Sequence, residues 1–251
     1  MKEILNCAMD IGEGMLTSGA EVHRVEDCLN RICCAFGAMR VDAFIITSSM
    51  VVTVVDERGE SYTQTRRIDT LGTDFYKLDK LNALSRRICA EKLSIEEIKE
   101  ALSGIQKGKT YSEWSLFLAY AAIAAAFTLF FGGTPLQAIF SFFIGAGVRL
   151  VSLLCEKTVK NLILSKLLGA FFVTLSAFFL TRLGWVQNSD KIIIGNIMLL
   201  VSGIGFTNAL RDLFTGDNVT GMLRLLEAVL TALALAAGYF LVVFLTGGAA
   251  V

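Results

Sequence analysis

The residues best suited to chemistry lie late in the chain, within stretches that are otherwise apolar. They are Asn196, Gly203, Thr207, Arg211, Asp212, Asp217 and Glu227. The first four share one face of an ideal helix, within about 80° of arc. An amide in hydrocarbon is costly unless it faces a partner or water, and a guanidinium offers paired donors that suit a carboxylate. We expect this face to line a substrate path, with the two aspartates at its inner mouth and Glu227 on a polar face of the next apolar stretch.

Simpler interpretations of these residues stay open. Asn196 can serve only to make a hydrogen bond between packed helices, and the charges around Arg211 can mark a solvated loop. Gly203 lies near the middle of its apolar stretch, where a loosened helix would free backbone groups for a ligand. The sequence alone leaves a substrate path and plain packing as alternatives.

A second candidate site lies near the N-terminus, on the polar face of a predicted helix. Its residues are Glu21, His23, Arg24 and Glu26. A histidine beside carboxylates can act as an acid, a base or a pH sensor, whereas the alternative is a solvated helix face. The chain has no GxSxG, Walker, GxGxxG or HExxH motif, and its single His and scattered Cys residues predict neither a metal site nor a cofactor.

Composition divides the chain into two parts. Residues 1–113 hold 18 acidic and 15 basic residues, whereas residues 114–251 hold 5 acidic and 8 basic ones. The net charge is zero, which excludes a strongly basic nucleic-acid-binding protein. The apolar content of 54% excludes intrinsic disorder, and the charged first residues do not form a secretory signal.

The second part is predicted to be a membrane domain, over residues 111–251. No charge occurs for 35 residues between Glu113 and Arg149, which is enough for two spans with a turn at the Gly and Pro residues 132–135. Five transmembrane helices are expected, at about 114–131, 136–153, 162–183, 192–210 and 225–245. Six Lys and Arg residues would face the side of the N-terminus and two the opposite side, so the N-terminus is expected in the cytoplasm and the C-terminus outside.

Residues 1–110 are predicted to form a small α+β cytoplasmic domain of order ααβββαα. Apolar residues at helical spacing alternate there with three strand-like runs, at residues 41–47, 50–56 and 61–68. Two capping boxes are expected at helix starts, from Ser18 with Glu21 and from Ser94 with Glu97.

Two motifs at opposite ends of the chain resemble those of the threonine/serine exporter family. The first is LTSGAEVHRVE at residues 16–26, and the second is SGIGFTNALRD at residues 202–212, continued by Gly216, Asp217, Gly221 and Arg224. Relatives commonly carry Pro-Gly where this chain has Ser202-Gly203, so the helix break there can differ. The resemblance covers nearly the whole chain.

The resemblance implies a bacterial inner-membrane exporter of small metabolites driven by an ion gradient. Threonine-like or serine-like amino acids and dicarboxylates such as succinate are the implied substrates, and both classes carry a carboxylate. The chain looks like the large subunit of a split system whose partner is a short membrane protein of about four helices, with homo-oligomers also conceivable. The alternatives are a membrane-anchored enzyme of hydrolase type and a regulatory or scaffold subunit without its own path.

Overall fold

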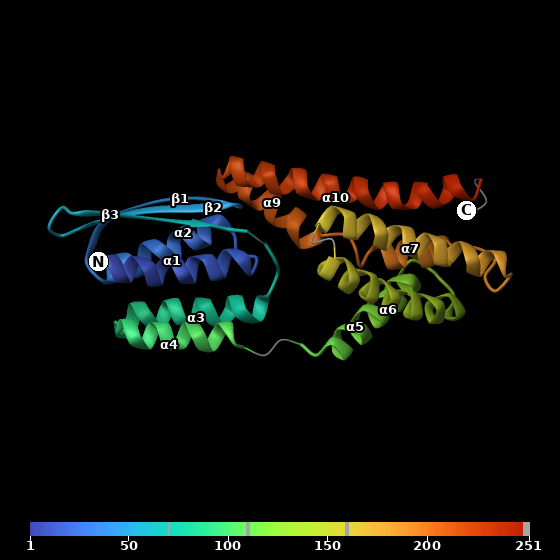
Figure 1. Cartoon of the computed structure of the whole chain (residues 1–251), viewed down its shortest axis with the longest axis horizontal. Coiled ribbons are helices and arrows are strands. Elements are labelled where there is room, and N and C mark those ends of the chain that lie inside the picture. The colour runs from blue at the N-terminus through green and yellow to red at the C-terminus, as the bar shows by residue number, and fades with distance from the viewer. Residues whose placement is uncertain (70, 109–110, 159–160, 248–251) are drawn as a thin grey trace. The chain divides into compact units, whose positions relative to one another are not determined.

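The computed structural model describes residues 1–69, 71–108, 111–158 and 161–247. The predicted domain boundary after residue 110 and the C-terminal residue 251 lie outside the described residues. The elements in chain order are α1 Lys2–Thr17, α2 Val22–Ala35, β1 Ala38–Ile46, β2 Ser49–Asp56, β3 Ser61–Arg67, α3 Phe75–Glu91, α4 Ile95–Gln106, α5 Glu113–Phe130, α6 Pro135–Thr158, α7 Leu162–Arg182, α8 Asp190–Ile197, α9 Gly203–Thr215 and α10 Asn218–Leu245 (Figure 1).

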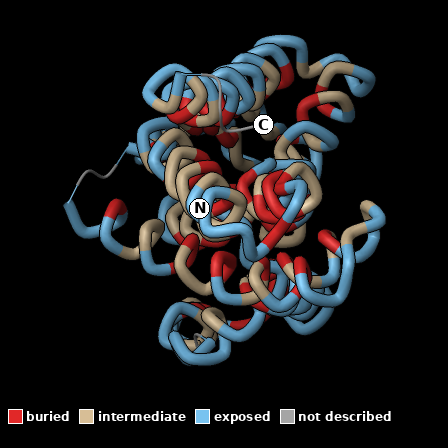
Figure 2. The backbone as a smooth tube through the Cα atoms, turned by 90° about the vertical axis from the view of Figure 1, so that its right-hand side faces the viewer, coloured by how far each residue is buried: buried red, intermediate tan, exposed pale blue. Residues whose placement is uncertain are grey.

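The chain divides into two compact units. The N-terminal unit comprises Met1–Lys109 together with Gly205–Leu225, and the membrane unit comprises Thr110–Ile204 together with Leu226–Val251. Most of α9 and the first turns of α10 therefore belong with the N-terminal elements, although they lie almost a hundred residues further along the chain. Buried residues alternate with exposed ones along many of the helices (Figure 2).

The N-terminal unit has the predicted order ααβββαα. An antiparallel sheet of order β1-β2-β3 covers α1 and α2, and α3 and α4 pack on the other side of α1 (Figure 1). The apolar faces of these elements meet in one core that contains Leu5, Leu29, Met50, Leu81 and Ile98, each at most 1% exposed. Helical and strand periodicity in the sequence thus translate directly into this layered fold.

The two predicted capping boxes have different outcomes. Ser94 and Glu97 form the expected reciprocal bonds at the start of α4. The box of Ser18 and Glu21 is wrong, because α2 begins at Val22 and Glu21 is its N-cap without a side-chain cap bond. The backbone of Gly19 adopts φ +96°, which turns the chain between α1 and α2 and separates the two partners.

The membrane unit contains most of the apolar helices. Among the described residues, four helices are long and apolar enough to cross a membrane: α5, α6, α7 and α10. They coincide with the first, second, third and fifth predicted spans, so the protein is a multi-pass membrane protein. The α5–α6 hairpin turns at Gly132, whose φ of +83° suits a residue without a Cβ.

The fourth predicted span, residues 192–210, is wrong as a single helix. Helix α8 ends at Ile197 and α9 begins at Gly203, with turns between them. The last turn of α8 tightens through i→i+3 bonds, and Leu200 in the break is 2% exposed within the apolar core of the membrane unit. Ser202 directly precedes α9, a position that Ser favours as an N-cap, so the Ser-Gly pair supports a restart even without proline.

Candidate functional site

A buried ion pair joins α9 to α10 in the N-terminal unit. Nη1 of Arg224 donates to Oδ2 of Asp212 at 2.8 Å, and the two side chains are 8% and 1% exposed. Nη2 of Arg224 donates to the backbone oxygen of Ala20 at 3.1 Å. Charges buried this deeply need both a partner and further hydrogen bonds, and this pair has both.

A second ion pair lies beside the buried one and is more exposed. Nη1 of Arg211, on α9, donates to Oε1 of Glu21, the residue that precedes α2. The Arg211 side chain is 62% exposed and that of Glu21 is 17% exposed. Glu21, Arg211, Asp212 and Arg224 together are called the ion-pair cluster below. The cluster brings together residues of both motifs: Glu21 belongs to residues 16–26, and the other three belong to the motif that begins at residue 202.

The loop between α1 and α2 supplies backbone partners to α9. The carbonyl oxygen of Gly19 accepts from Nδ2 of Asn208 at 3.4 Å. A Cβ at Gly19 would approach the carbonyl oxygen of Gly72 to 3.1 Å, in addition to the strain of the positive φ. The glycine in the N-terminal motif is therefore required where α9 packs against the loop.

Two carboxyl groups in this region have raised pKa values. Burial raises the pKa of Asp212, and the nearby Asp217 and Glu21 raise it further, whereas Arg224 and the backbone N–H of Val22 lower it. Burial is also the largest reason that the pKa of Glu26 is raised; Asp217 adds to it and His23 opposes it. Glu26 and Asp217 therefore belong to the same electrostatic environment.

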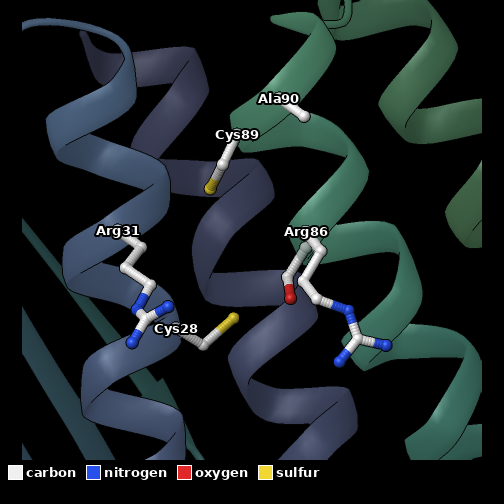
Figure 3. A pocket seen from close by; sticks show the side chains of 6 residues that line it. Cys28, Arg31, Arg86, Cys89 and Ala90 are labelled. Carbon is white, nitrogen blue, oxygen red and sulfur yellow. The ribbon is translucent and has the colours of Figure 1, made fainter.

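Two grooves open on the N-terminal unit near the first motif. One, of about 300 Å³, is lined by residues that include His23, Glu26 and Asp27. The other, of about 330 Å³, lies between α2 and α3, where Figure 3 shows Cys28 and Arg31 on one helix and Arg86 and Cys89 on the other. Burial raises the pKa of Cys28 to about 11, so its thiol stays protonated at neutral pH and is poorly suited to nucleophilic attack.

The structure distributes the predicted path residues over both units. Thr207, Arg211, Asp212 and Asp217 lie in the N-terminal unit, and Asn196, Gly203 and Glu227 lie in the membrane unit. The single helical face from which we derived the path does not exist, because the chain leaves the helical conformation after Ile197. Of the N-terminal candidates, Glu21 joins the cluster and Glu26 lies near it, while His23 and Arg24 are exposed.

Asn196 is part of a buried polar chain in the membrane unit. Its Nδ2 donates to Ser141 Oγ at 3.1 Å and to the Ile192 carbonyl oxygen at 2.9 Å. The hydroxyls of Ser141 and Thr128 are 2.6 Å apart, and all three polar side chains are fully buried. This arrangement connects α5, α6 and α8, in agreement with the interpretation of Asn196 as an interhelical hydrogen-bond donor.

Sequence reasoning overlooked Arg149 as a site residue. It lies on α6, is 8% exposed, and pairs with Glu113 and Glu156. A lone arginine near the end of a span suggests only an orientation signal. The available clue was the spacing of Arg149 and Glu156, because residues seven apart share a helix face.

Comparisons with known proteins identify the same family as the motifs at residues 16–26 and 202–212. Residues 6–246 match the ThrE family of threonine/serine exporters. The chain is 22% identical over 242 residues to a "Probable threonine/serine exporter" of Mycobacterium tuberculosis, covering 91% of this chain and 43% of that protein. It is 24% identical over 247 residues to a "Probable succinate transporter subunit YjjP" of Escherichia coli, covering 98% of this chain and 96% of that protein.

A third relative shows the same difference in coverage. The threonine/serine exporter of Corynebacterium glutamicum is 23% identical over 242 residues, which are 94% of this chain and 50% of that protein. The chain thus spans about half the length of the exporters named for threonine and serine, and nearly all of the succinate transporter subunit. No solved structure matches the chain. Because the family match extends over almost every residue, the chain belongs to the threonine/serine exporter family.

Proposed function

We propose that the protein is the larger subunit of a secondary exporter for small metabolites that carry a carboxylate. Membership of the exporter family and four apolar helices of spanning length support this function. Relatives are named for threonine and serine or for succinate, and all three solutes carry a carboxylate. Export would use an ion gradient.

A separate small membrane subunit completes this proposal. The chain covers 96% of a relative named a transporter subunit but only half of the exporters named as whole proteins. We propose that the part of the longer relatives outside the matched region corresponds to the short partner of about four helices. The isolated chain is therefore expected to be transport-incompetent, and co-expression with that partner should restore efflux.

Five membrane crossings, with the N-terminus in the cytoplasm and the C-terminus outside, fit the contacts of α9. Helix α9 bonds to Gly19 and Glu21, so it lies on the same side of the membrane as the N-terminal elements. Three spanning helices, α5 to α7, lie between them in the chain, and an odd number of crossings would end on the opposite side. We therefore propose that α8 and the turns after it supply a fourth crossing and that α10 supplies a fifth.

The topology can be tested by reporters on both sides of the last span. Fusions after Gln106 and at the end of α10 should report opposite sides of the inner membrane. The same side for both would mean an even number of crossings and would refute the five-span topology.

The ion-pair cluster is proposed to bind substrate and to link the N-terminal unit to α10. The Asp212–Arg224 pair is the observation that carries this role, because it fixes α9 to the helix that continues into the membrane. Arg211 is held by one carboxylate and is more than half exposed, so a substrate carboxylate can compete with Glu21 for its donors. Thr207 and Asp217 would flank this inner mouth.

The test is substrate efflux by the complete exporter with Arg211→Lys. Lysine keeps the charge but loses the planar fork, so efflux should fall about tenfold or more while folding survives. Arg40→Lys is the matched control, because Arg40 is 72% exposed and also pairs with a carboxylate, Asp42. Normal efflux of succinate, threonine and serine by a well-expressed Arg211→Lys variant would contradict this role.

A further inference from the structure

One buried guanidinium in the membrane unit has an unused donor. Arg149 on α6 donates from Nη2 to Oε2 of Glu113 at 3.1 Å and from Nη1 to Oε1 of Glu156 at 3.2 Å. Its Nε is buried and has no hydrogen-bond partner among the described residues. Buried donors in folded proteins are almost always paired, so the unpaired Nε of Arg149 needs an explanation.

The unused donor is half of a fork. Nε and Nη2 lie on one edge of the planar guanidinium, and a carboxylate with two oxygens engages such an edge with two parallel hydrogen bonds. Glu113 contacts this edge through Nη2 alone. The guanidinium carbon also lies over the Tyr120 ring, 5.8 Å from its centroid, within the range of a cation–π contact. One donor of this edge therefore has no acceptor among the described residues, so the edge has room for one oxygen of a bidentate ligand.

The surroundings differ from those of a permanent ion pair. The Arg149 side chain is 10% exposed, whereas Glu113 and Glu156 are 58% and 60% exposed. The cation is buried, whereas Glu113 is more than half exposed, so breaking this one contact costs less than breaking a fully buried pair while Glu156 still holds Nη1.

We propose that Arg149 binds the carboxylate of the exported solute through its Nε–Nη2 edge and that Glu113 occupies half of this edge in the resting state. Glu156 keeps its bond to Nη1 while the solute is bound, so the guanidinium does not lose its position. The identity of the solute rests on the proposed function. The same edge would also suit the phosphate of an anionic lipid headgroup, which the experiment must separate from a solute.

Equilibrium binding of radiolabelled succinate to the full chain in phosphatidylcholine nanodiscs tests the proposal, with labelled threonine as a parallel probe. Removing the resting competitor in Glu113→Gln should tighten binding about tenfold, and losing the fork in Arg149→Lys should weaken it about tenfold or more. Arg182→Lys is the matched control, because it alters an exposed arginine at the end of another spanning helix, and it should bind like the wild type.

The direction of the affinity change in Glu113→Gln distinguishes a solute-binding site from a purely structural ion pair. If Arg149 only holds α5 against α6, Glu113→Gln lowers the melting temperature and leaves succinate and threonine affinity unchanged or weaker, which overturns the proposal. Wild-type affinity in a folded Arg149→Lys variant overturns it as well. Glu113 is exposed, so this variant should fold even where Arg149→Lys does not.

A lipid arm and the efflux assay complete the test. Affinity for either solute that persists when the discs contain phosphatidylglycerol supports a solute site, whereas its loss assigns the edge to lipid and overturns the proposal. Absence of binding of both probes, even in Glu113→Gln, also overturns it. The Arg211 efflux assay tests the proposed function without altering Arg149, so the two proposals can fail separately.

Discussion

The buried arginines of the two units differ in how deeply their carboxylate partners are buried. Arg224 in the N-terminal unit pairs with a carboxylate that is as buried as itself, and it adds a backbone oxygen as a further acceptor. Arg149 in the membrane unit is equally buried, but both of its carboxylates are more than half exposed, and its Nε has no partner in the described part of the chain. The first arrangement suits a permanent joint, because neither charge can leave. The second suits exchange, because only the cation is fixed.

The largest loss of folding stability is expected when the Asp212–Arg224 ion pair is broken. Arg224→Met would leave the Asp212 carboxylate buried without its cation, which costs about 3–5 kcal/mol. The double variant Asp212→Leu with Arg224→Met removes both charges and should recover most of this loss. Urea unfolding of the full chain in detergent, followed by hydrogen exchange of the α2 amides, measures both. A double variant no more stable than the single one would show that the pair is not the joint we describe.

A smaller loss is expected in the loop on which this joint rests. Gly19→Ala forces a side chain into φ +96° and against the Gly72 carbonyl, at a cost of about 1–3 kcal/mol. Gly104→Ala is the control, because a Cβ there meets nothing within 4 Å in the helix α4, and it should be neutral or slightly stabilising. Equal unfolding midpoints for Gly19→Ala and Gly104→Ala would show that the conformation of the loop at Gly19 does not contribute to stability.

Removing one exposed carboxylate that pairs with Arg149 should lower the free energy of unfolding by still less. Glu156→Gln leaves Arg149 paired with Glu113, and a pair so open to solvent contributes about 0–1 kcal/mol. Its unfolding midpoint should therefore lie close to that of the wild type. A loss as large as that of Arg224→Met would make both arginines permanent joints and erase the contrast between the units.

Local patterns predicted most of the fold, and contacts between distant segments account for the failures. The order ααβββαα and four spans follow from periodicity and apolar length, which need no tertiary information. The break after Ile197 and the role of Glu21 do not follow from such patterns. Glu21 was assigned to a capping box, but Arg211, 190 residues away, binds it instead. Arg149 was missed because Glu113, on α5, meets it only after α5 and α6 pack, and the one local clue was Glu156 seven residues further along α6.

The candidate path shows the same limit. Projection of Asn196 and Arg211 onto one ideal helix assumed a continuous helix, but residues 198–202 interrupt it before α9 begins at Gly203. Instead, residues of the two family motifs meet in the ion-pair cluster, a contact that the sequence did not predict. Sequence composition could identify the important segments, but only the fold shows which side chains they bring together.

The smallest expected effect concerns the carboxyl beside the cluster. Burial, and next the charge of Asp217, raise the pKa of Glu26, so the folded chain binds its proton more tightly than the unfolded chain does. Stability from this group is therefore fully present below the ordinary glutamate pKa of 4.5 and is lost as pH rises through the raised value. Glu26→Gln removes the charge and keeps the shape. It should stabilise the full chain at pH 8 by under about 1 kcal/mol and have no effect near pH 4.

Unfolding midpoints of Glu26→Gln at several pH values check this, with Glu100→Gln on the exposed face of α4 as the control. A gain that is independent of pH would mean that the substitution improves packing and not charge. Destabilisation at pH 8 would mean that the Glu26 carboxylate is favourable there and that His23, which opposes the shift, outweighs burial and Asp217. The Asp217 charge would then act weakly on α2, and the influence of the α9–α10 turn on the N-terminal motif would be confined to the ion-pair cluster itself.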